Sequence, residues 1–513
     1  MGAPAAKAEH HPDDEPTAPA PPPGPGPPQV APFALAPVSA IAAALAAVLT
    51  AYSPRYGFHR DELYFIAAGH HPAWGYSDQP PLTPLIARAS TALFGESPAG
   101  LRVAATLFVA AAVITVAAIA RELHGGRPAQ ILAALTAATS GFVVGIGHLL
   151  STATLDLLAW LVVTLLVLRL LRTGNPRWWI PIGATTGLTL ENKYLVVLLF
   201  AALLPSLATL GPRRVLRSPH LLTAIALALA IAAPNVIWQA THDWPQLHVA
   251  GGINREDGIE NRTLFIGEQL LYLSPLYVPI WIAGWLRLRR TPSLRWARSI
   301  TVAYPLLCLL VIATGGKAYY AIPLLLVLLA AGCEPAVRWA RRRLLITAVT
   351  LTAAVTAVLS LPLLPTSAIA IPQAVNPEVA EEVGWPQLTD AVARAWSRIP
   401  PPDRPRAVIL AQNYGQAGAL AHYGPSRKLP TAYSGHMSFA DWGPPPNEAN
   451  GPVILILQRG SKGYEADFTG CRQATRVDNG QGVDNEEQDA AIMLCTGTAR
   501  PWSSLWPHVR HLY

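Results

Sequence analysis

Carboxylates and aromatic residues are concentrated in one short connection between apolar runs. Residues 60–64 read RDELY, with Asp61 and Glu62 adjacent, and residues 75–82 read GYSDQPPL, with Asp78 close to two prolines. A carboxylate in such a place can take a proton from a hydroxyl group or stabilise positive charge that develops at a carbon atom. The alternative is that these acids are ordinary solvated loop charges. The aromatic residues beside them make the connection amphipathic, which is typical of a segment lying along a membrane surface and favours a chemical role.

Lysine is almost absent from the apolar part of the chain. Between residues 30 and 365 only Lys193 and Lys317 occur, whereas the basic clusters there consist of arginine. Glycines 315 and 316 precede Lys317, and glycine lets backbone N–H groups approach an anion, while lysine binds phosphate as a point charge. A lysine that merely extends from a helix end to the membrane surface is the alternative. The pattern favours anion binding by both lysines.

Asp156 is a further candidate, because it lies near the end of an apolar run in the stretch STATLDLL. A carboxylate at that depth is costly, so it indicates a functional site. A charge that stabilises a helix N-terminus is the alternative reading.

The composition indicates what must position these residues. Of 513 residues, 51% are hydrophobic and only 13% are charged, whereas a soluble protein carries about a quarter charged residues. About eleven apolar runs approach the length that crosses ~30 Å of hydrocarbon. The sequence therefore predicts an α-helical polytopic membrane protein with spans at 32–52, 99–120, 128–147, 151–171, 178–191, 195–211, 220–239, 264–286, 299–314, 319–336 and 344–363.

Arginine clusters fall at every second connection between these runs. The positive-inside rule assigns such connections to the cytoplasm. Both lysines and the acidic connection at 53–98 are then on the opposite, extracytoplasmic side. The net charge of +7 is explained by these clusters rather than by a nucleic-acid partner, and their members are Arg121, Arg127, Arg169, Arg172, Arg177, Arg213, Arg214, Arg217, Arg287, Arg289, Arg290, Arg295, Arg298, Arg338, Arg341, Arg342 and Arg343.

The two ends of the chain differ from its middle. Residues 1–30 are rich in proline and predict a disordered cytoplasmic tail. Residues 31–364 form the transmembrane domain, and residues 365–513 are polar and predict a small extracytoplasmic α/β domain. Within it, residues 407–410 and 453–457 are typical of short buried strands, and residues 388–399 and 416–422 of helices. An extracytoplasmic location would allow a disulfide between Cys471 and Cys495.

These motifs, taken in order, resemble the bacterial glycosyltransferase family 39 proteins. That family is related to the dolichyl-phosphate-mannose protein mannosyltransferases and to the aminoarabinose transferases that modify lipid A. The resemblance covers nearly everything from about residue 35 onward. It rests on RDELY at 60–64, GYSDQPPL at 75–82, NKY at 192–194, GKAYY at 316–320, and the C-terminal segments NYGQAGA at 413–419 and YSGH at 433–436.

The resemblance implies a GT-C fold with its site on the extracytoplasmic side and a polyprenyl-phosphate sugar as donor. Asp61 matches the catalytic carboxylate of the family, with Glu62 beside it. The resemblance allows a divalent metal ion as cofactor and implies no other. The expected substrate-binding residues are Arg60, Tyr64, Asp78, Asp156, Lys193, Tyr194, Lys317, Tyr319 and Tyr320.

The sequence therefore predicts an inverting glycosyltransferase of the plasma membrane. Asp61 would act as the base on an acceptor hydroxyl, and Lys193 and Lys317 would hold the leaving phosphate. The acceptor would be an extracytoplasmic glycan, lipid or protein of the cell envelope. The alternative is a transporter or flippase of a lipid-linked or anionic substrate, which requires charges at mid-span and broken helices in paired halves. A structural membrane protein with a binding ectodomain would leave the placement of the lysines unexplained.

Overall fold

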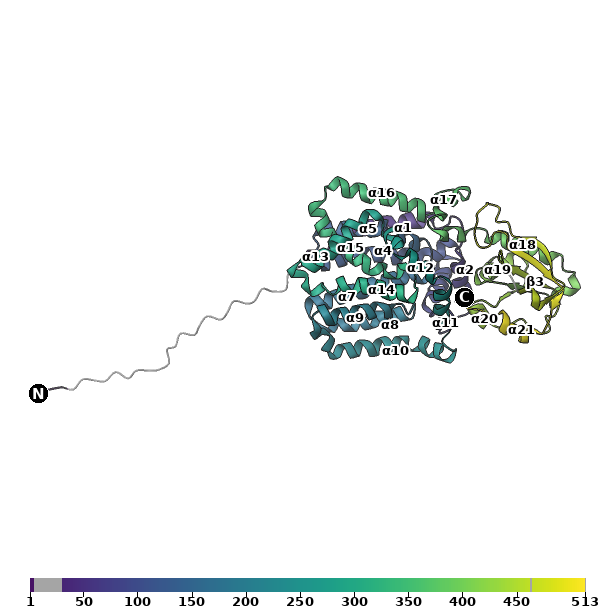
Figure 1. Cartoon of the computed structure of the whole chain (residues 1–513), viewed down its shortest axis with the longest axis horizontal. Helices are drawn as coiled ribbons and strands as arrows, with labels where there is room; N and C mark the ends of the chain where they lie inside the picture. The colour runs from purple at the N-terminus through teal and green to yellow at the C-terminus, as the bar shows by residue number, and fades with distance from the viewer. Residues whose placement is uncertain (4–29, 462–463, 513) are drawn as a thin grey trace.

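Figure 1 shows the computed structural model, which describes residues 1–3, 30–461 and 464–512. Helices from residue 35 to residue 360 run side by side as a bundle, and a smaller α/β unit lies against one end of that bundle. The predicted disordered tail, residues 1–30, falls almost entirely outside the described residues.

Long apolar helices dominate the bundle, as predicted. Among the described residues, seven helices are long and apolar enough to cross a membrane. They are α1 (Leu35–Tyr52), α4 (Pro98–Glu122), α7 (Thr152–Thr173), α10 (Pro219–Thr241), α14 (Ile300–Thr314) with the turn before it, α15 (Ile322–Trp339) with the turn before it, and α16 (Arg342–Ser360). The number rises to nine if two bent pairs each form one span, namely α5 (Arg127–Thr139) with α6 (Gly141–His148) and α12 (Gly258–Leu273) with α13 (Val278–Arg290).

The predicted fold class is confirmed, but the predicted count of about eleven spans is higher than the structure supports. The two extra runs form α8 (Trp179–Leu190) and α9 (Val196–Leu210), which have 12 and 15 residues. At 1.5 Å per residue these helices extend only ~18 and ~23 Å, less than the ~30 Å of a hydrocarbon core. A short turn at Pro176–Trp178 precedes α8, which begins at Trp179. The polar residues Glu191–Lys193 separate it from α9.

The bundle has a central helix and a lipid-facing periphery. In the span that contains α15, 89% of the most apolar window is buried, against 17% in α16. The outer helices expose large apolar side chains such as Leu229 on α10 and Leu351 on α16. Such a surface is compatible with surrounding lipid and would be unfavourable in water.

Arginine-rich connections meet at one end of the bundle. Glu122, at the end of α4, bonds Arg172 at 2.5 Å and lies 3.5 Å from Arg169. Arg287 of α13 donates a hydrogen bond of 2.8 Å to the carbonyl oxygen of Leu123. Three connections that the charge pattern assigned to one side of the membrane therefore lie together.

The opposite end of the bundle carries short helices and the α/β unit. Helices α2 and α11 lie beside this unit in Figure 1. Helix α3 packs against α2. The acidic connection of the sequence analysis thus lies between the bundle and the C-terminal domain. The three helices are α2 (Arg60–His70), α3 (Leu82–Phe94) and α11 (Pro245–Glu256).

The C-terminal unit is built on a five-stranded mixed sheet of order β2-β1-β3-β6-β5. Strand β1 is parallel to β2 and β3, while β6 is antiparallel to β3 and β5. Both predicted strands and both predicted helices are present, as β1, β3, α18 and α19. The elements are α17 (Ala370–Gln373), α18 (Trp385–Ser397), β1 (Val408–Ala411), α19 (Tyr414–Tyr423), β2 (Ala432–Ser434), α20 (Ser438–Asp441), β3 (Val453–Leu457), β4 (Phe468–Thr469), β5 (Arg472–Arg476), β6 (Ala491–Cys495), β7 (Gly497–Thr498) and α21 (Trp502–Val509).

The two faces of this sheet bury different partners. Strand residues alternate between the faces. Leu410 and Leu455 pack with Trp502 of α21 on one face. Ile409 and Ile454 belong instead to a cluster that contains residues of α18, α19 and α2. Helix α2 of the acidic connection is therefore part of the core of the C-terminal domain.

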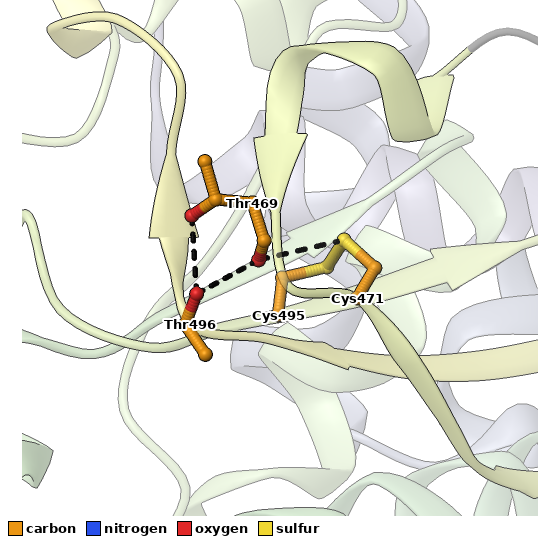
Figure 2. Close-up of a disulfide and its surroundings, with 4 residues drawn as sticks. All are labelled: Thr469, Cys471, Cys495 and Thr496. Carbon is orange, nitrogen blue, oxygen red and sulfur yellow. Dashed lines mark hydrogen bonds between the residues drawn. A yellow bond between two sulfur atoms is a disulfide. The ribbon is translucent and has the colours of Figure 1, made fainter.

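A disulfide joins Cys471 and Cys495 beside the sheet (Figure 2). Cys471 directly precedes β5 and Cys495 ends β6, so the bond fastens two paired strands at their ends. Thr496 donates its backbone N–H to the carbonyl oxygen of Thr469 at 2.8 Å, which begins the small β4–β7 ladder. The structure thus forms the disulfide that the sequence left open.

Glycines of α19 explain how it approaches α2 so closely. A Cβ atom at Gly418 would lie 3.0 Å from the backbone of Leu63, and one at Gly415 would lie 3.1 Å from Cβ of Arg60. These glycines belong to the NYGQAGA segment. A larger side chain at Gly418 would push the two helices apart, because core packing leaves little room.

A buried arginine fixes the start of α2. Arg102 of α4 is fully buried and bonds Glu62 through Nε at 2.9 Å and through Nη2 at 2.7 Å. Its other donors reach the carbonyl oxygens of Ser53 at 2.8 Å and Gly57 at 2.7 Å. Glu382 of the C-terminal domain lies 3.5 Å away. One guanidinium therefore ties α1, α2, α4 and the C-terminal domain together.

Removal of the Glu62 charge is expected to destabilise this junction strongly. In Glu62→Gln the Arg102 guanidinium stays buried without its main counter-ion, which costs about 3–5 kcal/mol. We expect a large fall in Tm in detergent, measured by fluorescence-detected size exclusion after heating. The matched control is Glu96→Gln, whose carboxylate is 41% exposed and pairs with His422 at 2.7 Å, and which should cost at most about 1 kcal/mol. Equal Tm values for the two variants would contradict the role of the buried pair.

Candidate active site

Asp61 lies at the start of α2, where its side chain is 36% exposed. Its Oδ1 accepts a hydrogen bond of 2.7 Å from the hydroxyl of Tyr414. Among the described residues no donor bonds its Oδ2. The backbone N–H of Asp61 donates to Nδ1 of His59 at 3.2 Å, which caps the helix. One carboxylate oxygen is thus oriented by the protein and the other is free to meet a substrate.

Glu62 has a different environment, although it is the next residue. Its side chain is fully buried, and its two oxygens accept bonds from Arg102, from the backbone N–H of Leu150 at 2.9 Å and from that of His59 at 2.9 Å. These are the contacts of a structural residue. The geometry gives Glu62 no free oxygen for the catalytic role that the sequence analysis expected.

Arg60 and Tyr64 both lie close to Tyr414. The guanidinium of Arg60 pairs with Glu486 at 2.7 Å and lies 6.0 Å from the centre of the Tyr414 ring. The centre of the Tyr64 ring lies 5.1 Å from the centre of the Tyr414 ring, and Tyr64 is buried. Both predicted substrate contacts therefore help to hold Tyr414, which in turn holds Asp61.

Asp78 is brought to the same cluster by Tyr64. The Tyr64 hydroxyl donates to Oδ1 of Asp78 at 2.5 Å. Burial raises the pKa of Asp78 to about 7. The negative charges of Asp61 and Asp441 also raise this pKa, whereas the hydrogen bond from Tyr64 lowers it. Asp78 therefore changes its ionisation near neutral pH, unlike an ordinary aspartate.

A second group of predicted residues surrounds Lys193. Its Nζ donates to the Tyr319 hydroxyl at 3.2 Å and lies 5.2 Å from the centre of the Tyr320 ring. Asp156, near the start of α7, accepts a bond of 3.1 Å from the indole of Trp160 and interacts electrostatically with Lys193. The structure thus brings together one lysine, two tyrosines and one buried carboxylate from three distant segments.

Lys317 is connected to these groups through electrostatic interactions. Among the described residues no carboxylate forms an ion pair with its ammonium group. Its electrostatic neighbours are Glu268 and Glu378. Glu378 also interacts with Arg60, and Tyr319 interacts with both Glu378 and Asp61. The carboxylates at α2 and the lysines of the bundle therefore share one electrostatic environment.

Tyr194 is the predicted site residue that the structure does not bring into either group. Its hydroxyl bonds the side chain of Asn235, which donates to the carbonyl oxygen of Trp74 at 2.8 Å. Tyr194 therefore supports the loop before Asp78 and is placed to act indirectly.

Two residues of the site were missed or undervalued by sequence reasoning. Glu378 accepts from Nε2 of His59 at 2.9 Å, and Tyr414 bonds Asp61. The signal for Glu378 was the group of acids at 378–382, which follows the last apolar run after a short connection. Tyr414 belongs to the NYGQAGA segment, which contributed to the resemblance but received no role of its own.

The described residues contain no group of three or more His, Cys, Asp or Glu side chains placed to hold a metal ion. Asp61 and Asp78 each bond a tyrosine hydroxyl instead. The residues present thus do not fit the divalent metal that the resemblance allowed, and we assign no step to one. They do provide a half-exposed carboxylate beside cationic side chains, which suits proton removal next to an anionic leaving group.

Comparisons with known proteins give a family match for one part of the chain and a similar fold for most of it. Residues 78–238, which include Asp78, Asp156 and Lys193, match the family described as dolichyl-phosphate-mannose-protein mannosyltransferase. A comparison with curated protein sequences gives no significant match.

Three solved structures resemble the whole chain. ArnT from Cupriavidus metallidurans in the apo state has a TM-score of 0.58 at 13% identity and covers 89% of this chain and 97% of its own. The same protein bound to undecaprenyl phosphate gives 0.58 at 14% identity with equal coverage. The arabinofuranosyltransferase AftD from Mycobacteria gives 0.52 at 13% identity over 90% of this chain and 40% of its own. The structural likeness shows the fold, so the chain has a multi-pass membrane fold similar to that of these transferases. Residues 78–238 are in addition similar to the mannosyltransferase family.

Proposed function

We propose that this protein transfers a sugar from a polyprenyl-phosphate donor to an extracytoplasmic acceptor of the cell envelope, with inversion at the sugar carbon. The observation that carries the proposal is an oriented, partly exposed Asp61 that interacts with Tyr319, the hydroxyl partner of Lys193. Lys317 interacts in turn with Glu378, which lies beside His59 and Arg60. The solved relative that binds undecaprenyl phosphate supports a donor of this class.

The proposed reaction is a single displacement. Asp61 takes the proton of an acceptor hydroxyl as its oxygen attacks the anomeric carbon of the donor sugar. The bond between that carbon and the phosphate oxygen breaks on the opposite face, so the configuration inverts. Negative charge grows on the departing phosphate, and Lys193 and Lys317 stabilise it more in the transition state than in the ground state.

The sidedness of the site rests on charge and on the chain path. The arginine-rich end of the bundle corresponds to the cytoplasmic side under the positive-inside rule. Helix α2, which begins with Arg60 and Asp61, and the C-terminal domain lie at the other end (Figure 1). Seven spans, or nine if both bent pairs cross the membrane, are an odd number, which would put the N-terminus in the cytoplasm and the C-terminal domain outside.

The transporter alternative fits the site less well. It requires charges along a pathway through the middle of the spans. Here Asp61 and Asp78 lie in connections, Lys193 and Lys317 follow helix ends, and Asp156 lies in the first turns of α7. Charges at one end of a bundle suit chemistry at a membrane surface.

Asp61→Asn should abolish transfer without unfolding the protein. The amide oxygen still accepts the bond from Tyr414, but the base is lost, and we expect kcat to fall by about 10²–10⁴-fold. Release of polyprenyl phosphate from a panel of polyprenyl-phosphate sugars measures this in detergent. Asp390→Asn, at a 50% exposed carboxylate of α18, is the control and should retain full activity. Undiminished turnover by Asp61→Asn would show that another group takes the proton.

Lys193→Gln and Lys317→Gln should each reduce kcat/KM for the donor. A charged hydrogen bond to a phosphate is worth about 1.5–3 kcal/mol, which corresponds to roughly 10–150-fold. Lys193→Arg should recover part of the loss, because it restores the charge. Lys428→Gln, at an exposed lysine of the C-terminal domain, serves as control. Losses no greater than in this control would remove both lysines from the phosphate site.

The pH dependence of transfer should report on Asp78. Its pKa of about 7 means that the carboxylate is mostly protonated at pH 6 and mostly ionised at pH 8. An ionised Asp78 accepts hydrogen bonds from sugar hydroxyls better than the neutral acid, so kcat/KM should rise across this interval. Asp78→Asn should lower the rate and remove this rise. A variant that keeps the wild-type pH profile would exclude Asp78 as the titrating group.

A further inference from the structure

An apolar groove lies on the bundle at the end opposite the candidate active site. It has a volume of about 680 Å³ and is lined by residues of α5, α15 and α16. This volume falls within the ~300–1,000 Å³ of ordinary ligand sites. Helix α16 is the least buried span, so the groove opens where a helix stands partly away from the bundle.

The groove has a charged mouth and an apolar floor. Arg127 is the first residue of α5 and Arg342 the first residue of α16, and both line the groove. Below them, Ile131 and Leu135 of α5 face Leu345 and Val349 of α16 along the same cavity. Both helices therefore begin at the mouth and extend about two turns, or ~11 Å, along the floor.

The two arginines lack acidic partners in the part of the chain that the structure describes. The nearest candidate acid, Glu334, is already engaged, because it bonds Arg338 at 2.5 Å and the backbone N–H of Gly126 at 2.8 Å. Arg127 and Arg342 are both exposed, and neither forms a described ion pair. Unpaired cations above an apolar floor complement a molecule with an anionic head and a hydrocarbon tail.

We infer that this groove binds an anionic phospholipid of the leaflet that faces the arginine-rich end. The phosphate would lie between Arg127 and Arg342, and an acyl chain would lie along Ile131, Leu135 and Val349. The charge pattern assigns that end to the cytoplasmic leaflet, which is rich in anionic lipids. The lipid would fill the space between α5 and α16 and brace the outermost span against the bundle.

Native mass spectrometry of the full chain in detergent tests the site with phosphatidylglycerol as probe. We expect one phosphatidylglycerol to be retained in preference to phosphatidylcholine. In the double variant Arg127→Gln with Arg342→Gln, affinity should fall about 30-fold. Each cation near an anionic lipid contributes about 1 kcal/mol, which corresponds to about five-fold in affinity. Val349→Trp should displace the lipid by filling the floor. The matched control, Arg213→Gln with Arg217→Gln, changes two arginines of another cluster and should leave binding intact.

Several results would overturn the inference. Equal retention of the two lipids, or equal loss in the control variant, would mean that the mouth does not select charge. Competition by inorganic phosphate as effective as that by phosphatidylglycerol would mean that the floor contributes nothing. Stronger binding of a polyprenyl phosphate would assign the groove to that lipid instead. A gain in phosphatidylglycerol binding after deletion of residues 1–29 would mean that this acidic segment is the native occupant.

Discussion

The buried pair of Arg102 and Glu62 is the constraint on which the rest of the structure depends. A guanidinium removed from water must satisfy its donors locally, and here they reach the end of α1, the segment between α1 and α2, and Glu62 of α2. Glu62 is fixed by this requirement. Successive helical residues point about 100° apart. Because Glu62 points inward to Arg102, the side chain of Asp61 points away from that buried pair and toward Tyr414. Two adjacent acids therefore acquire different environments, one buried against Arg102 and one partly exposed beside Tyr414.

The C-terminal domain is part of the candidate site rather than an appendage. Helix α2 lies in the same apolar cluster as α18, α19 and one face of the sheet. Glycines of α19 allow the close approach that brings Tyr414 to Asp61. The segment before the sheet contributes Glu378, which connects His59 with the electrostatic environment of Lys317. The membrane bundle supplies the cations, and the junction with the domain supplies the oriented carboxylate.

Patterns confined to one segment were predictable from the sequence, and pairings between distant segments were not. Continuous apolar runs predicted the bundle, and the short runs at 407–410 and 453–457 predicted β1 and β3, because burial on both faces requires such composition. The run at 178–191 matches α8 (Trp179–Leu190) to within one residue at each end, so the predicted number of spans differs because this helix is short and not because its ends were misplaced. The burial of Glu62 depends on Arg102, 40 residues away, and nothing in RDELY distinguishes its two acids. Glu378 was missed because its partner His59 lies 319 residues earlier.

The bond between Tyr414 and Asp61 also sets an order of events in the life of each molecule. These residues are separated by 353 positions. At ~5–20 residues per second of synthesis, the ribosome reaches Tyr414 roughly 20–70 s after Asp61. The bundle can enter the membrane during that interval while the carboxylate still lacks its orienting hydroxyl. A partly made chain therefore holds Asp61 without its orienting partner, and only the translated and docked C-terminal domain completes the candidate site.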